Sequence, residues 1–143
     1  MNPHVVSSKV LSEVITREKN NPGGIFTVKS KSTGKEYSYK IKRTEWNGKW
    51  FTHIKVEKNG GSRFVYLGWF GNDGKLHRAG SVVNTPAAVA IAAVLNMVAK
   101  KKFDWLDEKM ELYHAGSCLV CGKTLTDSES INRGIGPVCA GIH

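Results

Sequence analysis

The sequence predicts an α+β protein: an antiparallel β-meander packed on a buried helix, followed by a small C-terminal zinc-binding module. Residues 25–78 alternate short β-rich runs with turn signals. Residues 87–100 are almost all apolar, and all three cysteines lie within the last 26 residues. We expect a basic β-rich domain with its covering helix over residues 1–102. Residues 103–143 are expected to hold a linking helix and the zinc module.

A short helix is expected near the start of the chain. Apolar residues recur at helical spacing from Val10 to Ile15, and the turn-forming residues 20–24 end the pattern. Strands follow, separated by turns rich in Asn and Gly, which is typical of an antiparallel meander. The expected strands are residues 25–31, 36–43, 49–57, 62–70 and 75–78.

A second helix is predicted by its first two residues. Thr85 can accept a hydrogen bond at the N-cap, and Pro86 suits the first helical position. The stretch that follows is apolar on most faces, so the helix must be buried. It ends in three lysines at 100–102, and a further helix over residues 103–113 leads to the cysteines.

The cysteines have the spacing of a tetrahedral zinc site. Cys118 and Cys121 form a CxxC pair, and Cys139 supplies a third thiolate. His114 is the first candidate for the fourth ligand, and His143 is the second. A disulfide would leave one cysteine unpaired, and a catalytic zinc would keep one position open to water, so we predict structural Zn²⁺.

The C-terminal residues resemble a small, mostly bacteriophage-encoded domain of unknown function. That domain has the pattern CxxCGxxLTxxxSIxxGIGPxC, which the residues from Cys118 to Cys139 follow. The resemblance covers about 30 residues, and it implies a fold fragment and a metal but no activity. Independently of it, Thr126 or Asp127 can cap a short turn beginning at Ser128.

The net charge of +9 belongs entirely to the front of the chain. Residues 1–83 hold 15 Lys and Arg against 6 Asp and Glu, whereas residues 84–143 hold 6 of each. Aromatic residues alternate with cations in the predicted strands, as in platforms that bind single-stranded nucleic acid. The alternation places Tyr37, Tyr39 and Ile41 on one face and Lys40 with Lys42 on the other. The predicted nucleic-acid-binding residues are Lys40, Lys42, Arg43, Lys55 and Arg63.

A protein partner is the alternative, because a basic face would also steer binding to an acidic host or phage protein. No phosphate-binding loop, GxSxG elbow or HExxH pair occurs, so we expect no enzyme and infer no small-molecule substrate. The longest apolar run, residues 87–95, has nine residues, against roughly 20 for a membrane span, and no signal peptide is evident. We therefore expect a cytoplasmic protein with no membrane partner.

Overall fold

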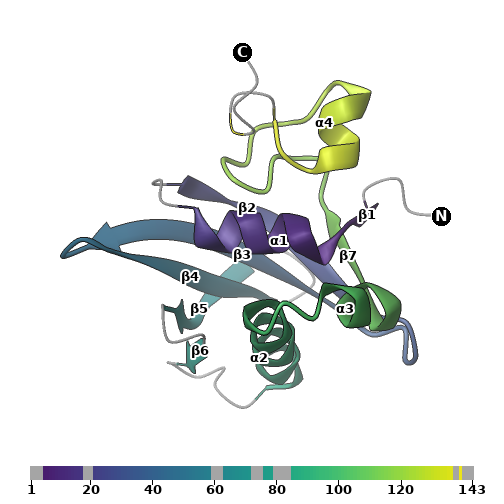
Figure 1. The fold of residues 1–143 in the computed structure, drawn as a ribbon, viewed down its shortest axis with the longest axis horizontal. Helices are drawn as coiled ribbons and strands as arrows, with labels where there is room; N and C mark the ends of the chain where they lie inside the picture. Colours follow the sequence, from purple (N-terminus) through teal and green to yellow (C-terminus); the bar gives the residue numbers. More distant parts are fainter. Residues whose placement is uncertain are drawn as a thin grey trace.

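The structure, a computed structural model, describes residues 5–17, 21–58, 63–71, 76–78, 85–136 and 139. Its strands form one seven-stranded antiparallel sheet in the order β1-β7-β2-β3-β4-β5-β6 (Figure 1). The strands are β1 (Val5–Val6), β2 (Asn21–Ser30), β3 (Glu36–Trp46), β4 (Lys49–Lys58), β5 (Arg63–Phe70), β6 (Leu76–Arg78) and β7 (Met110–His114). Strands β2 to β6 are the predicted meander.

The turn between β3 and β4 shows why consecutive strands pair in this way. Asn47 and Gly48 both have positive φ angles, 50° and 76°. A two-residue turn with two positive φ values matches the twist of the flanking strands, and Asn-Gly is the sequence that adopts it most readily. The register of the hairpin follows, with Trp46 directly opposite Lys49.

Two strand assignments differ from the prediction. Residues 110–113 were expected to continue a helix, but they belong to β7, which pairs with β1 on one side and β2 on the other. Strand β2 begins at Asn21, within the segment expected to be a turn. The predicted second domain thus contributes a strand to the sheet of the first, and the division after residue 102 stays a prediction.

Within the described residues four helices accompany the sheet: α1 (Ser8–Thr16), α2 (Pro86–Ala99), α3 (Phe103–Lys109) and α4 (Ser128–Arg133). The predicted cap of α2 is present, because the Thr85 side chain accepts a hydrogen bond from the backbone of Ala88. In α4 the cap is Asp127, whose Oδ2 accepts from the Ser130 N–H at 3.0 Å. Figure 1 shows α1 crossing in front of the strands and α4 beyond the end of the sheet.

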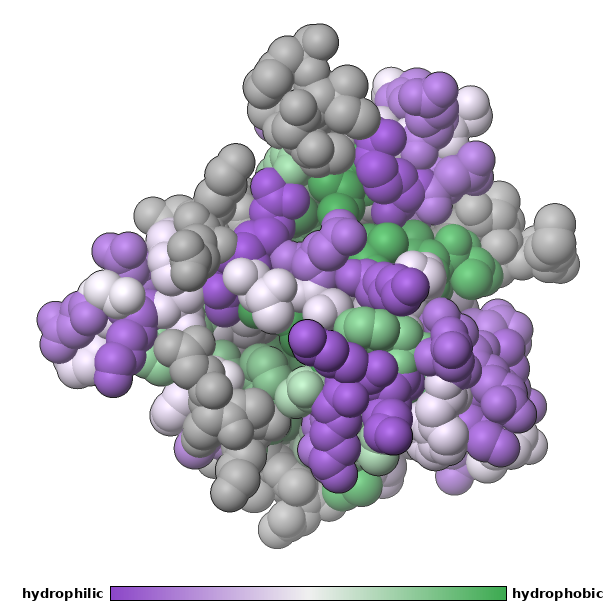
Figure 2. All heavy atoms as spheres, viewed as in Figure 1, coloured by the Kyte–Doolittle hydropathy of each residue, from purple (hydrophilic) through white to green (hydrophobic). Residues whose placement is uncertain are grey.

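Buried apolar residues from α1, α2 and the central strands belong to one hydrophobic cluster. Alternate residues of the central strands are buried, among them Tyr39, Ile41 and Ile54. The Tyr39 hydroxyl donates to the Ala87 carbonyl of α2 at 2.5 Å. On the face shown in Figure 2, hydrophilic residues cover much of the surface and apolar residues form smaller patches between them. Among the described residues, no helix is long and apolar enough to span a membrane.

Candidate functional site

Two of the cysteines lie on one tight loop after β7. Ser117 and Thr124 form an isolated antiparallel bridge that closes the loop. Within it the Gly122 N–H donates to the Cys118 carbonyl at 2.9 Å, and Gly122 has a φ of 80°, which favours glycine. The loop thus turns Cys118 and Cys121 toward the same point.

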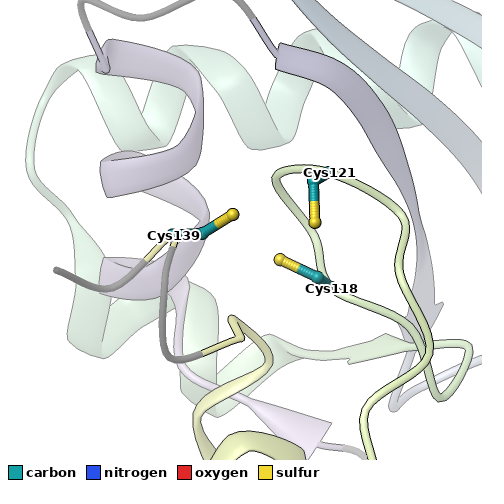
Figure 3. A group of neighbouring side chains, drawn as sticks. All are labelled: Cys118, Cys121 and Cys139. Carbon is teal, nitrogen blue, oxygen red and sulfur yellow. The ribbon is translucent and has the colours of Figure 1, made fainter. Parts of the chain in front are cut away.

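The chain returns to this loop through α4. Gly134 ends the helix in the left-handed conformation, and its carbonyl accepts a hydrogen bond from the Leu119 N–H at 2.9 Å. Cys139 then completes a group of three thiols whose sulfur atoms all lie within 4.8 Å of one another. Figure 3 shows the three sulfur atoms pointing toward a common centre. The three cysteines could therefore hold a metal ion.

The backbone prepares Cys118 for the thiolate state that a metal requires. Burial acts to raise the pKa of this thiol, but hydrogen bonds from backbone N–H groups outweigh burial and bring the pKa below its usual value. Two of these bonds come from Val120 at 3.4 Å and Gly136 at 3.3 Å. Burial and the nearby sulfur groups raise the pKa of Cys139 to about 12. A divalent cation would lower the pKa of Cys139 again, because it stabilises every thiolate around it.

His114, the first candidate for the fourth ligand, does not join the sulfur group. Its side chain is 2% exposed, and Nδ1 accepts a hydrogen bond from the Gly116 N–H at 2.9 Å. Because Nδ1 accepts, Nε2 carries the proton and donates to the Ile131 carbonyl at 2.6 Å. The imidazole thus ties β7 to α4 with both nitrogens engaged. His143, the second candidate, lies outside the described residues.

The cysteine loop rests directly on the beginning of β2. The Gly23 N–H donates to the Val120 carbonyl at 3.2 Å. A Cβ atom on Gly24 would lie 2.4 Å from the Cys118 carbonyl oxygen, so only glycine fits there. The sequence marked these glycines only as a turn signal, because nothing local indicates which segment approaches them.

The predicted basic face is the side of the sheet opposite the core. Its cations lie in two neighbouring cross-strand rows: Lys40 is directly opposite Lys55, and Lys42 is directly opposite His53. On β5, Tyr66 pairs with Lys55 and Trp69 pairs with His53. A bulge at this point places Leu67 in the core, which keeps Tyr66 and Trp69 on the same side of the sheet.

These residues line a hollow of about 370 Å³. It is bounded by Lys40, Lys42, Thr44, His53, Lys55 and Tyr66. His53 stands between two hydroxyl groups, with Nε2 2.7 Å from Thr44 Oγ1 and Nδ1 3.0 Å from Tyr66 Oη. Burial and the charge of Lys42 lower the pKa of His53. Burial raises the pKa of Tyr66, so its hydroxyl keeps its proton.

Two predicted nucleic-acid-binding residues do not reach this hollow. Arg43 is only 5% exposed and faces the core, where it donates to the Arg17 carbonyl and to Thr52 Oγ1. Arg63 is exposed at the start of β5, on the strand side that it shares with Val65 rather than with Tyr66. Conversely, the predicted binding residues did not include His53, which lies among the lysines of the hollow. Its cross-strand partner Lys42 was the missing signal.

Aromatic side chains extend the same face beyond the hollow. Trp69 stacks on His77 with ring centroids 3.9 Å apart and meets Phe51 edge-on at 5.4 Å. Trp46 is 67% exposed near the end of the β3–β4 hairpin. Tyr66, 38% exposed, is the aromatic residue that lines the hollow itself.

Comparison with known protein families gives a match at the C-terminal end of the chain. Residues 111–143 match a family of unknown function (DUF6011), and this range includes all three cysteines. No curated protein and no solved structure matches the chain. The match identifies the C-terminal residues as similar to a domain whose role is not known. The phage origin and the motif stay predictions.

Proposed function

We propose that the protein binds nucleic acid through the open face of its sheet, and that structural zinc holds its C-terminal module. The observation that carries the first part is the hollow formed by Lys40, Lys42 and Lys55. Among the described residues, no carboxylate lines it or pairs with these lysines. Like charges directly opposite each other destabilise a sheet, and a bound phosphate backbone would relieve that repulsion.

The aromatic residues favour a single strand as the ligand. Flat side chains next to cations can stack unpaired bases while the cations contact phosphates, an arrangement that is tolerant of sequence. Tyr66 lies beside the lysines, and Trp46 lies further along the same side of β3. A base pair buried inside a duplex would not offer its faces to these rings.

A charge-reversal experiment tests this function. Changing Lys40, Lys42 and Lys55 together to Glu should abolish binding of a single-stranded oligonucleotide at low salt. The matched control changes Lys100, Lys101 and Lys102 to Glu, since these exposed lysines follow α2 and give the same change in net charge. Single replacement of each hollow lysine by Gln should flatten the dependence of log affinity on log salt by about 0.7.

The charge-reversal experiment can either support or refute the open face as the binding site. If the hollow variant keeps its affinity, or if both triple variants lose it equally, the face is not the binding site. Should the native protein show no salt-sensitive binding at all, an acidic protein surface becomes the leading ligand, because the same three lysines would steer it. In the proposal the protein acts as a binding protein and not as an enzyme.

Zinc is the metal that the thiols favour. Three sulfur ligands on tight turns, with N–H groups bonded to one of the sulfurs, suit a tetrahedral structural site. Thiolate ligands also agree with a reducing compartment such as the cytoplasm of a bacterial host. Elemental analysis should find one zinc per chain, and replacing Cys139 by Ser should weaken binding. Absence of zinc, or a disulfide between Cys118 and Cys121 under reducing conditions, would contradict the assignment.

A further inference from the structure

The cross-strand register makes the hollow a more specific site than a basic surface. Like charges that lie directly opposite each other on neighbouring strands destabilise a sheet. Here Lys40 and Lys55 are direct cross-strand neighbours, and Lys42 is the direct neighbour of His53. Three lysines and one histidine in two consecutive rows therefore surround one hollow, together with two hydroxyl groups, from Thr44 and Tyr66.

His53 controls how many donors these hydroxyls can offer. A neutral imidazole has one nitrogen without a proton, so either Thr44 or Tyr66 must donate its own proton to the ring. A protonated imidazole donates from both nitrogens, so both hydroxyls accept from the ring and keep their own protons available. Protonation thus adds a positive charge and a free O–H donor to the hollow.

We propose that this hollow seats a single phosphate group and that seating the phosphate is coupled to proton uptake by His53. The inference rests on the proposed function for the origin of the phosphate, a nucleic-acid strand. Three lysines and two hydroxyls supply the charge and the hydrogen-bond donors that a tetrahedral oxyanion requires. The phosphate belongs either to a phosphodiester inside the strand or to a terminal phosphomonoester, and these sources can be separated experimentally.

The direction of the pH effect follows from the groups that face His53. They are Lys40, Lys42 and Thr44 from β3, Lys55 from β4 and Tyr66 from β5, and the next aromatic pair, Trp69 and His77, extends to β6. In the free protein burial and Lys42 lower the pKa of His53, so the ring is neutral at about pH 8. A bound phosphate brings negative charge, which raises the pKa. Affinity should therefore increase as pH falls.

The test follows the His53 ring by NMR in the full-length protein. The probes are inorganic phosphate, an unphosphorylated oligothymidylate and the same strand with a 5′-phosphate. We expect a saturating oligothymidylate to raise the pKa of His53 by about one unit, which corresponds to about 3- to 10-fold tighter binding at about pH 5.5 than at about pH 8. A shift with the unphosphorylated strand identifies an internal phosphodiester, and a shift only with the 5′-phosphorylated strand identifies a terminal one.

A variant separates coupling from a purely structural role. His53→Gln can keep both hydroxyl contacts but cannot change charge, so oligonucleotide binding by this variant should lose its pH dependence between about pH 8 and about pH 5.5. His77→Gln changes a residue on the same face but outside the hollow, so this variant should keep the pH dependence of binding. If oligothymidylate binds while the pKa of His53 stays fixed, the coupling is refuted and the proposed function stands. If only inorganic phosphate raises the pKa of His53, the phosphate site is supported and the proposed nucleic-acid function is refuted.

Discussion

Adding one methyl group at Gly24 should separate the cysteine loop from the sheet. A Cβ atom there would lie 2.4 Å from the Cys118 carbonyl oxygen and 2.6 Å from the Leu119 backbone, whereas ordinary contacts begin at 3.4 Å. Both neighbours are backbone atoms, so the loop must move by about 1 Å to accommodate alanine. Overpacking of this kind costs about 1–3 kcal/mol. That range corresponds to about 5- to 150-fold in an equilibrium constant.

Gly136→Ala is the matched control for Gly24→Ala. Neither glycine has a positive φ, and among the described residues a Cβ on Gly136 would meet only Leu125 Cδ2, at 3.7 Å. Alanine lowers the entropy of the unfolded chain similarly at both positions, so the difference between the variants isolates the clash. We expect Gly24→Ala to lower the urea midpoint and to weaken zinc in competition with a chelator, and Gly136→Ala to change neither appreciably. Equal behaviour of the two variants would refute the close packing of the loop on β2.

Three further substitutions test contacts on the core side of the sheet. Arg43→Gln should lower the free energy of unfolding by about 1–3 kcal/mol, because the Arg17 carbonyl and Thr52 lose a buried donor. The oligonucleotide affinity of the folded variant should stay unchanged. Reduced affinity at unchanged stability would instead place Arg43 in the binding surface. Tyr39→Phe should destabilise by about 1 kcal/mol in urea unfolding, because it removes the buried hydrogen bond from the hydroxyl to the Ala87 carbonyl. The control Tyr37→Phe should be near neutral, since the Tyr37 hydroxyl has no partner among the described residues. His114→Ala should lower the free energy of unfolding by about 2–5 kcal/mol, because two buried hydrogen bonds and the ring are lost. The folded variant should still bind zinc. Complete loss of zinc binding with stability retained would make His114 the fourth ligand.

Local signals account for the elements that could be predicted from the sequence. Thr85 and Pro86 specify the start of α2 whatever lies around them, and Asn47 with Gly48 specifies a hairpin. The two faces of β3 followed from simple alternation around Tyr39. Each of these features depends on residues close in sequence, which is why it can be predicted without the rest of the fold.

The elements that the sequence did not predict depend on distant partners. Strand β7 exists because Leu112 pairs with Val28, more than 80 residues earlier in the chain. The side taken by Arg43 could have been predicted, since it shares the alternation of Tyr39 and Ile41. The side of the sheet taken by Arg63 could not have been predicted, because a bulge between Arg63 and Phe70 shifts the register of β5. The same bulge brings Tyr66 into the hollow with His53.

The cysteine group and the basic hollow lie on opposite sides of the sheet. Gly24, on which the cysteine loop rests, is opposite Ile41 and shares the core side of β2 with Phe26, whereas the next residue, Ile25, is opposite Lys40. Cys118 and its two following residues are buried as part of the core. A metal ion would therefore stabilise the core at the beginning of β2 without touching a ligand on the open face. Because residues 84–143 also carry no net charge, we expect a metal ion at the cysteines to stabilise the fold, and we expect the proposed ligand to bind to β3, β4 and β5.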